Sequence, residues 1–285
     1  MRTFRKSVQV IRHNTTAEFL ARAKPWLEAA EAENNLILGI AGVFESNPQQ
    51  PRVQPYFLTV EESDDIVGAA LMIPPRRLLM TRMPDLAVIA LADYMLADRA
   101  PLPGVLGPTN CAQVFAEKWR AETGVTARVK MSERLYACTA VAPPAWSRGF
   151  LRTASKEDES LLVKWAGEFC RDGKIEDEAA YMQSQIPILI AKKLLYVWET
   201  SEVVSMADLS RESAHGFAVS LVYTPAHLRN RGYATSCVAA LTRQVLESGK
   251  KFCCLYTDLS NPTPNSIYQK LGYQPVCDVQ DWIFV

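Results

Sequence analysis

The first half of the chain begins with apolar positions at helical spacing and continues with strand-like runs. Residues 16–39 repeat apolar side chains every three or four positions, and Thr15 or Thr16 is the expected N-cap. A polar, proline-broken loop is expected at Glu45–Pro55. Further strands are predicted at Tyr56–Val60, Ile66–Ile73, Arg77–Met83 and Arg134–Val141, with helices at Asp85–Leu96 and Cys111–Thr123.

The same order of elements restarts after Ala142-Pro143-Pro144, which is the best candidate for a linker. Helices are predicted at Ser155–Asp172 and Ala179–Lys193, and strands at Leu194–Glu199, Val203–Ser210, Gly216–Tyr223 and Phe252–Thr257. Helix, helix, strands, then helix and strand therefore occur twice. We interpret this as two α/β domains of one architecture, 1–142 and 143–285, although no sequence identity is visible between them. The alternative is one long α/β domain with an irregular N-terminal half.

Composition and charge narrow the function classes. Lys plus Arg equals Asp plus Glu at 31 each, so net charge gives no case for a nucleic-acid or membrane partner. The 7 cysteines form no CxxC pair or Cys/His metal spacing, which favours reduced thiols and no metal site. The N-terminus lacks the apolar stretch of a signal peptide, and no segment approaches the roughly 20 apolar residues of a membrane span. We expect a soluble, cytoplasmic protein.

A first chemical motif follows the strand that ends at Tyr223. Thr224-Pro225 stops strand pairing, and Gly232 precedes a strongly amphipathic helix. A strand, a glycine-containing loop and a helix N-terminus bring unpaired N–H groups together, where the helix dipole favours a phosphate. Arg229 and Arg231 would add charge-assisted contacts. The alternative is that the loop is an ordinary strand-to-helix turn.

A second motif follows the apolar strand Phe252–Thr257, which has the composition of a strand buried on both faces. After Asn261-Pro262, a short helix is expected with Thr263 as N-cap and Pro264 at its first position. Ile267 and Leu271 would face the core, and Tyr268 would lie beside that face. The alternative for Tyr268 is a half-buried aromatic residue with a structural hydrogen bond.

Together the two motifs resemble those of the GNAT (GCN5-related N-acetyltransferase) superfamily. Arg229-x-x-Gly232-x-Ala234 resembles its acetyl-CoA signature, with Ala234 in place of a glycine. Asn261-Pro262, Ser266-Ile-Tyr268 and Leu271-Gly272-Tyr273 resemble its next motif. The resemblance is specific over residues 215–275 and loose over 150–215. The fold it implies is α/β, with two GNAT-like domains that each have a mixed, mostly antiparallel, twisted sheet flanked by helices. The first half lacks the signature and would be a degenerate copy.

The resemblance implies an acetyltransferase that moves an acetyl group from acetyl-CoA, as co-substrate, to a primary amine by direct attack. Tyr268 would be the general acid, and a backbone N–H near Val222 would polarise the thioester carbonyl. The expected cofactor-binding residues are Leu221, Val222 and Thr224 for the pantetheine arm, Arg229, Asn230, Arg231, Gly232, Tyr233, Ala234 and Thr235 for the pyrophosphate, and Asn261.

The sequence leaves the general base and the amine open. The candidate bases are Glu199, Asp208, Glu212, His215 and Asp258, and a solvated turn or cap residue is the more common role for each of them taken alone. Two alternatives to acetyl transfer remain: another acyl or aminoacyl transfer on the same fold, and a non-catalytic module that binds acetyl-CoA.

Overall fold

The computed structural model describes residues 7–46 and 54–285, with only the backbone for 262–264. The chain folds into two compact units. The first comprises Met1–Leu135, Thr257–Ser260 and Val276–Val285, and the second comprises Tyr136–Tyr256 and Asn261–Pro275. No described helix is long and apolar enough to cross a membrane, and no potential metal-binding cluster is found in the described residues. Most of the loop expected at Glu45–Pro55 lies outside the described residues.

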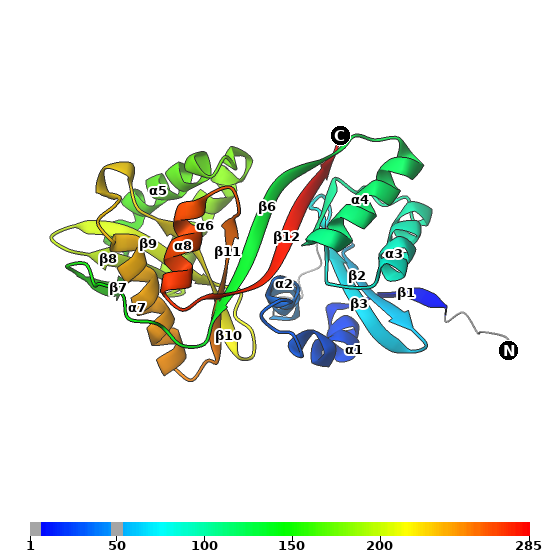
Figure 1. Cartoon of the computed structure of the whole chain (residues 1–285), viewed down its shortest axis with the longest axis horizontal. Helices are drawn as coiled ribbons and strands as arrows, with labels where there is room; N and C mark the ends of the chain where they lie inside the picture. The colour runs from blue at the N-terminus through cyan, green and yellow to red at the C-terminus, as the bar shows by residue number, and fades with distance from the viewer. Residues whose placement is uncertain (1–6, 47–53) are drawn as a thin grey trace. The chain divides into compact units, whose positions relative to one another are not determined.

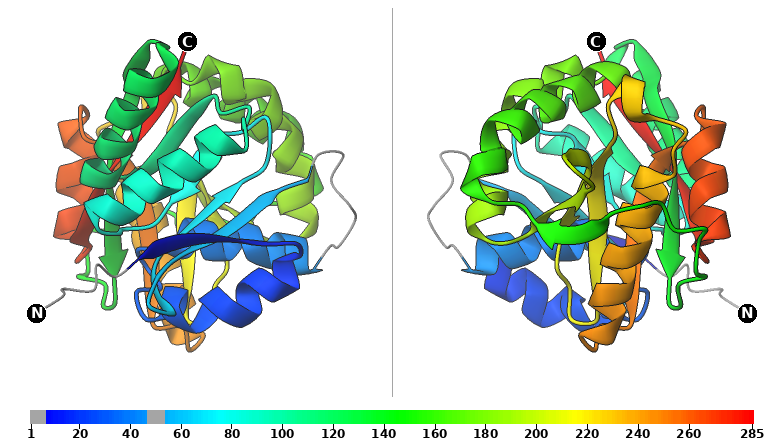
Figure 2. Two further views of the ribbon diagram at one scale, coloured as in Figure 1. Left: turned by 90° about the vertical axis from the view of Figure 1, so that its right-hand side faces the viewer. Right: turned by 90° about the vertical axis from the view of Figure 1, so that its left-hand side faces the viewer.

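The first unit is a mixed sheet with helices on both faces (Figures 1 and 2). Its strand order is β1-β2-β3-β4-β5-β12-β6, antiparallel from β1 to β4 and parallel between β4 and β5. The elements are β1 (Val8–His13), α1 (Thr16–Glu28), α2 (Asn35–Ser46), β2 (Tyr56–Glu62), β3 (Asp65–Met72), β4 (Leu78–Met80), α3 (Asp85–Ala97), β5 (Gly104–Pro108), α4 (Thr109–Thr123), β6 (Ala127–Cys138) and β12 (Gln274–Phe284).

Strand β2 explains why helices cover both faces of this sheet, because its residues are buried from Tyr56 to Glu61. Phe57 packs against α1 and α2, with its ring 5.6 Å from that of Phe19. Leu58 points the other way, into the core beneath α3 and α4. Alternate side chains of a strand face opposite sides of a sheet, so a continuous apolar run requires helices on both.

The helix predicted over 16–39 is two helices, because the side chain of Asn34 ends the first. Its Nδ2 donates at 3.0 Å to the carbonyl of Leu27 in the last turn of α1, which also accepts from the N–H of Ala30 at 3.2 Å. Helix α1 begins as predicted, with the Thr15 hydroxyl accepting from the N–H of Glu18.

The units differ in their bounds from the predicted division at residue 142. Strand β12 pairs antiparallel with β5, from Val279 opposite Pro108 to Ile283 opposite Gly104. The last residues of the chain therefore belong to the first unit. Strands β1 and β5, and β7 (Phe150–Thr153) in the second unit, were not predicted.

The second unit repeats the plan of the first. Its strand order is β11-β10-β9-β8-β7, antiparallel except where β10 meets β11. The elements are β7, α5 (Glu159–Asp172), α6 (Ala179–Ala191), β8 (Leu195–Glu199), β9 (Val203–Ser210), β10 (Gly216–Tyr223), α7 (Tyr233–Glu247), β11 (Phe252–Asp258) and α8 (Pro262–Lys270). Helices α5 and α6 share one core with the sheet, and α7 and α8 share the other.

A buried carboxylate ties α1 to β2 in the first unit. Arg22 donates from Nε and Nη2 to the two oxygens of Glu61, at 3.0 and 2.8 Å, and Thr59 Oγ1 donates at 2.9 Å. The bond from Arg22 lowers the pKa of Glu61 against the opposing effect of burial. Its contribution to stability is therefore present above the unfolded-state pKa of about 4.3 and is lost as pH falls through the folded-state value.

We predict that Glu61→Gln lowers the thermal midpoint at pH 7 by about 4 °C. The deficit should shrink in acid, because the wild-type carboxyl then becomes protonated as well. Glu122→Gln, at an exposed ion pair with Lys118, is the control and should change little. Thermal unfolding followed by circular dichroism from pH 3 to pH 7 measures both, and an equal deficit at every pH would contradict the assignment.

Candidate active site

Strands β10 and β11 pair only at their beginnings. The parallel register runs from Gly216 opposite Phe252 to Ala218 opposite Cys254, and β10 continues to Tyr223 beyond it. Parallel neighbours that stop pairing leave backbone groups available to a ligand between them. The split lies at the carboxyl ends of both strands, where open α/β sheets bind ligands.

The side of β10 that faces β9 is interrupted at the same level. Ser220 lies opposite Asp208, but the next registered pair is Tyr223 with Met206, so β10 carries an extra residue. Leu221 has a φ of 49°, which a non-glycine residue adopts only where the surroundings impose it. This β-bulge leaves Leu221 and Val222 without a registered partner on β9. Both are predicted pantetheine contacts.

The loop after β10 ends in a run of unpaired backbone donors. Asn230 and Gly232 both have left-handed conformations, with φ of 62° and 78°, and Gly232 is the N-cap of α7. Among the described residues, none accepts a hydrogen bond from the N–H groups of Asn230 to Thr235. Consecutive free N–H groups at a helix N-terminus form a binding site for an anion such as pyrophosphate.

Arg229, which is expected to supply charge to a phosphate, has partners within the protein. Its backbone N–H donates to the carbonyl of Ala226 at 3.3 Å, so the free run begins one residue later. Its Nε donates to the carbonyl of Thr224 at 2.9 Å, and its guanidinium pairs with Asp172 at the end of α5. Arg229 therefore holds the loop against α5. Sequence reasoning missed Asp172, because nothing in the chain links two residues so far apart.

Thr224 and Arg231 also have partners within the protein. The hydroxyl of Thr224 donates to Ser205 Oγ at 2.9 Å, which anchors the start of the loop to β9. Arg231 donates from Nη2 to the carbonyl of His227 at 3.4 Å. Its exposed side chain lies beside the free N–H groups.

Helix α8 begins earlier than predicted, at Pro262, with Asn261 as its N-cap. Tyr268 is on the core face rather than beside it: it is buried with Leu271, and its ring centroid is 5.8 Å from that of Tyr273. No described residue hydrogen-bonds the Tyr268 hydroxyl. Burial raises its pKa well above the usual value, so the phenol stays protonated at neutral and moderately alkaline pH.

The chain also resembles known proteins. Residues 199–283 match the family described as FR47-like protein. A similar solved structure is a GNAT-family acetyltransferase from Colwellia psychrerythraea, with 13% identity, a TM-score of 0.55 and 98% of each chain covered. A GCN5-related N-acetyltransferase from Sphaerobacter thermophilus has 16% identity and a TM-score of 0.63, covering 97% of this chain and 95% of that one. No curated protein matches the sequence.

A third similar structure is a tandem GNAT protein from the clavulanic acid biosynthesis pathway. It has 12% identity and a TM-score of 0.54, with 98% of each chain covered. The chain has a tandem GNAT fold. Each compact unit corresponds to one GNAT-like sheet with its two pairs of helices.

In the first GNAT-like unit, side chains fill the place between the corresponding strands. Met80 at the end of β4 contacts Gly107 of β5 where any side chain on that glycine would begin. The side chain of Met83 occupies the place that a Cβ on Gly68 would take, and the thiol of Cys111 donates to the carbonyl of Met83 at 3.4 Å. The registered pairing of β4 with β5 ends at Leu79 opposite Leu106, and the side chain of Met80 fills the space beyond it.

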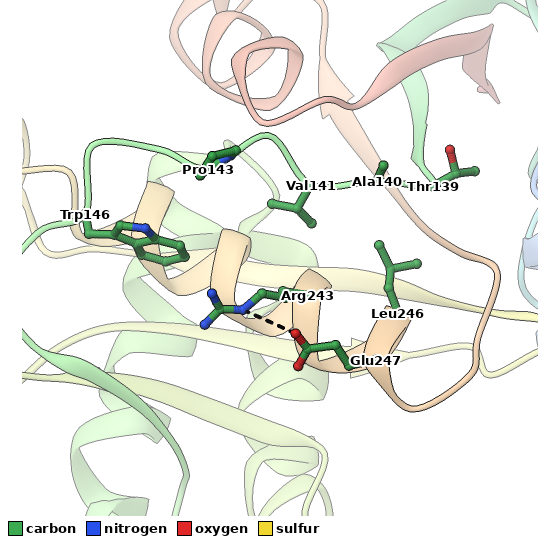
Figure 3. A pocket seen from close by; sticks show the side chains of 8 residues that line it. All are labelled: Thr139, Ala140, Val141, Pro143, Trp146, Arg243, Leu246 and Glu247. Carbon is green, nitrogen blue, oxygen red and sulfur yellow. Dashed lines mark ion pairs between the residues drawn. The ribbon is translucent and has the colours of Figure 1, made fainter.

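In the second GNAT-like unit, residues 139–147 link the two helices of the candidate site. The N–H of Ala142 donates to the carbonyl of Leu271 at the end of α8, and the N–H of Ser147 donates to Ser236 Oγ in α7, each at 2.9 Å. Figure 3 shows the open pocket of about 360 Å³ between this segment and α7. It is lined by Thr139, Ala140, Val141, Pro143, Trp146, Arg243, Leu246 and Glu247.

The candidate general bases divide into four that are not buried and one that is. Glu199 pairs with Arg152, Glu212 with Lys250 at 2.9 Å, and Asp258 accepts from the N–H and hydroxyl of Ser260 at 2.8 Å. The carbonyl of His215 accepts from the N–H of Lys251 at 2.7 Å, at the start of β11. Asp208 alone among the five candidates is buried within the sheet.

We predict that Gly232→Glu lowers the affinity for acetyl-CoA at least about 100-fold, because a carboxylate would occupy the place of the pyrophosphate. Gly124→Glu is a matched control: Gly124 has nearly the same conformation (φ 73°, ψ 3°) at the end of α4, with no atom within 4 Å of the added carbon. Calorimetric titration should give one site per wild-type chain and near-normal affinity for the control. Equal losses in both variants would point to backbone strain instead.

Proposed function

We propose that the second unit transfers an acetyl group from acetyl-CoA to a primary amine by direct attack. The observation that carries this proposal is the run of free N–H groups from Asn230 to Thr235, immediately beyond the separation of β10 from β11. An anion site next to exposed strand backbone suits a ligand with a pyrophosphate and an extended amide arm. Coenzyme A has both.

Different residues of the site would bind different parts of acetyl-CoA. The N–H groups from Asn230 to Thr235 would bind the pyrophosphate, with Arg231 adding charge from the surface. Backbone groups of Leu221 and Val222 would hydrogen-bond the amide arm, and the N–H of Val222 would donate to the thioester carbonyl as negative charge develops. Asn261 would contact the arm from the start of α8.

Tyr268 would act as the general acid. The amine nitrogen forms a bond to the carbonyl carbon, the carbon–sulfur bond breaks, and the Tyr268 hydroxyl gives its proton to the sulfur. A phenol with a raised pKa is protonated before the reaction. The Tyr268 hydroxyl remains a suitable proton donor, because without this proton the coenzyme A sulfur would leave as an anion into a buried site.

The first test is the release of free thiol from acetyl-CoA with a panel of primary amines: an alkylamine, a polyamine, an amino sugar and a lysine peptide. Turnover with one of them, and mass-spectrometric detection of the acetylated product, would support the proposal. Transfer only from longer acyl-CoA donors would place the activity in another acyl class. Tight acetyl-CoA binding without transfer to any amine would favour a binding module.

With the best amine, we predict that Tyr268→Phe lowers kcat by about 100-fold while the affinity for acetyl-CoA stays within a factor of about two. Tyr273→Phe is the control, because the hydroxyl of that buried tyrosine is bound to Thr242 at 2.6 Å. It should retain turnover and lose about 1 kcal/mol of stability. Steady-state kinetics beside calorimetry separates the two effects, and full turnover in Tyr268→Phe would contradict the assignment.

A further inference from the structure

Asp208 is a buried carboxylate without a salt bridge among the described residues; the charge of Arg211 acts on it only from beyond ion-pair distance. It is 5% exposed in β9, and no described Lys, Arg or His lies within ion-pair distance of it. Its hydrogen-bond partner is the hydroxyl of Ser220, directly opposite on β10, and Ser210 Oγ lies 3.0 Å from Ser220 Oγ. An unpaired charge inside a sheet is costly, so its presence requires an explanation beyond packing.

The place of this cluster is set by the β-bulge. Ser220 is the last residue of β10 before Leu221, where the strand loses its register with β9. Asp208 and Met206 are two residues apart on β9 and so face the same side, and Met206 packs in the core of α5 and α6. Tyr268 packs in the opposite core, with α7 and α8. The carboxylate and the phenol therefore lie on the two sides of the sheet at the level of the bulge.

We propose that Ser220 and Asp208 form a proton relay that deprotonates the acceptor amine. The inference rests on the proposed function, because it takes the thioester carbonyl to be held at the bulge. The amine would then approach from the side of Ser220, and the sulfur would leave toward Tyr268.

In this relay the nitrogen–carbon bond forms as the carbon–sulfur bond breaks. One proton passes from the amine nitrogen to Ser220 Oγ while the hydroxyl proton of Ser220 passes to Asp208 Oδ1. The Tyr268 proton goes to the sulfur. Protons and charge balance without a further reactant. Ser220 touches the amine, and Asp208 is the positioning residue that acts through it.

The electrostatics of the cluster suit this role. Burial raises the pKa of Asp208, and the bond from Ser220 and the charge of Arg211 oppose that rise. The residues opposite Asp208 on the neighbouring strands are Leu195 and Ser220, neither of them charged. A carboxylate with a raised pKa is a stronger base than an exposed one, and it costs stability at neutral pH, where it must ionise in the interior.

The test compares Asp208→Asn with the wild type in three measurements, using acetyl-CoA and the best amine of the panel. We expect kcat to fall about 100-fold. We also expect unchanged acetyl-CoA affinity, and a thermal midpoint at pH 7 that is equal or higher. In the wild type, the acid limb of the kcat profile should follow the ionisation of Asp208. In the variant that limb should disappear, so that the rate follows only the fraction of neutral amine.

Two further variants complete the test. Ser220→Ala should lower kcat and lose the acid limb as Asp208→Asn does, because Asp208 acts on the amine only through the Ser220 hydroxyl. Glu202→Gln, which removes an exposed carboxylate from the β8–β9 turn, should leave kcat and the profile unchanged. Wild-type turnover with an unaltered acid limb in Asp208→Asn overturns the relay alone. Absence of acetyl-CoA binding and turnover in the wild type overturns the proposed function and the relay with it.

Discussion

The backbone hydrogen bonding of β10 is the constraint on which the rest of the second unit depends. Every buried peptide group needs a partner, and a strand inside a sheet normally finds one on each side. Strand β10 loses its register with β9 after Ser220, and its pairing with β11 ends at Ala218. Strand β11 therefore releases β10 at about the level where the bulge interrupts its pairing with β9, which resumes at Tyr223 opposite Met206. The consequence is a segment of interior backbone whose donors and acceptors are open to a ligand.

Such a break is tolerated because the two cores on either side of the sheet remain packed. Without the extra residue, the side chains of β10 would alternate strictly between the two faces of the sheet to the end of the strand. With it, Leu221 and Tyr223 join the core of α5 and α6, while Val219 and Val222 join that of α7 and α8. The bulge thus releases peptide groups without withdrawing an apolar side chain from either core.

The sequence predicted this region well because its determinants are local. The strand end at Tyr223, the Gly232 N-cap and the helix that follows are all written in contiguous residues, and the structure has them where expected. It failed where a partner is distant in the chain. It did not foresee the salt bridge of Arg229 to Asp172, nor the pairing of β12 with β5 that places the C-terminus in the first unit. The sequence also did not predict strands β1, β5 and β7.

The two units show how one architecture reaches opposite local outcomes. Both units contain a pair of parallel strands followed by a helix. In both, a glycine lies in or after one of these strands. At Gly107 the missing side chain makes room for Met80, so that a flexible thioether fills the space beyond the last registered pair of β4 and β5. At Gly232 the missing side chain permits a left-handed N-cap, and the N–H groups around it stay free. In the first unit the glycine makes room for a packed side chain, whereas in the second it leaves backbone N–H groups free for a ligand. This difference supports placing the chemistry in the second unit.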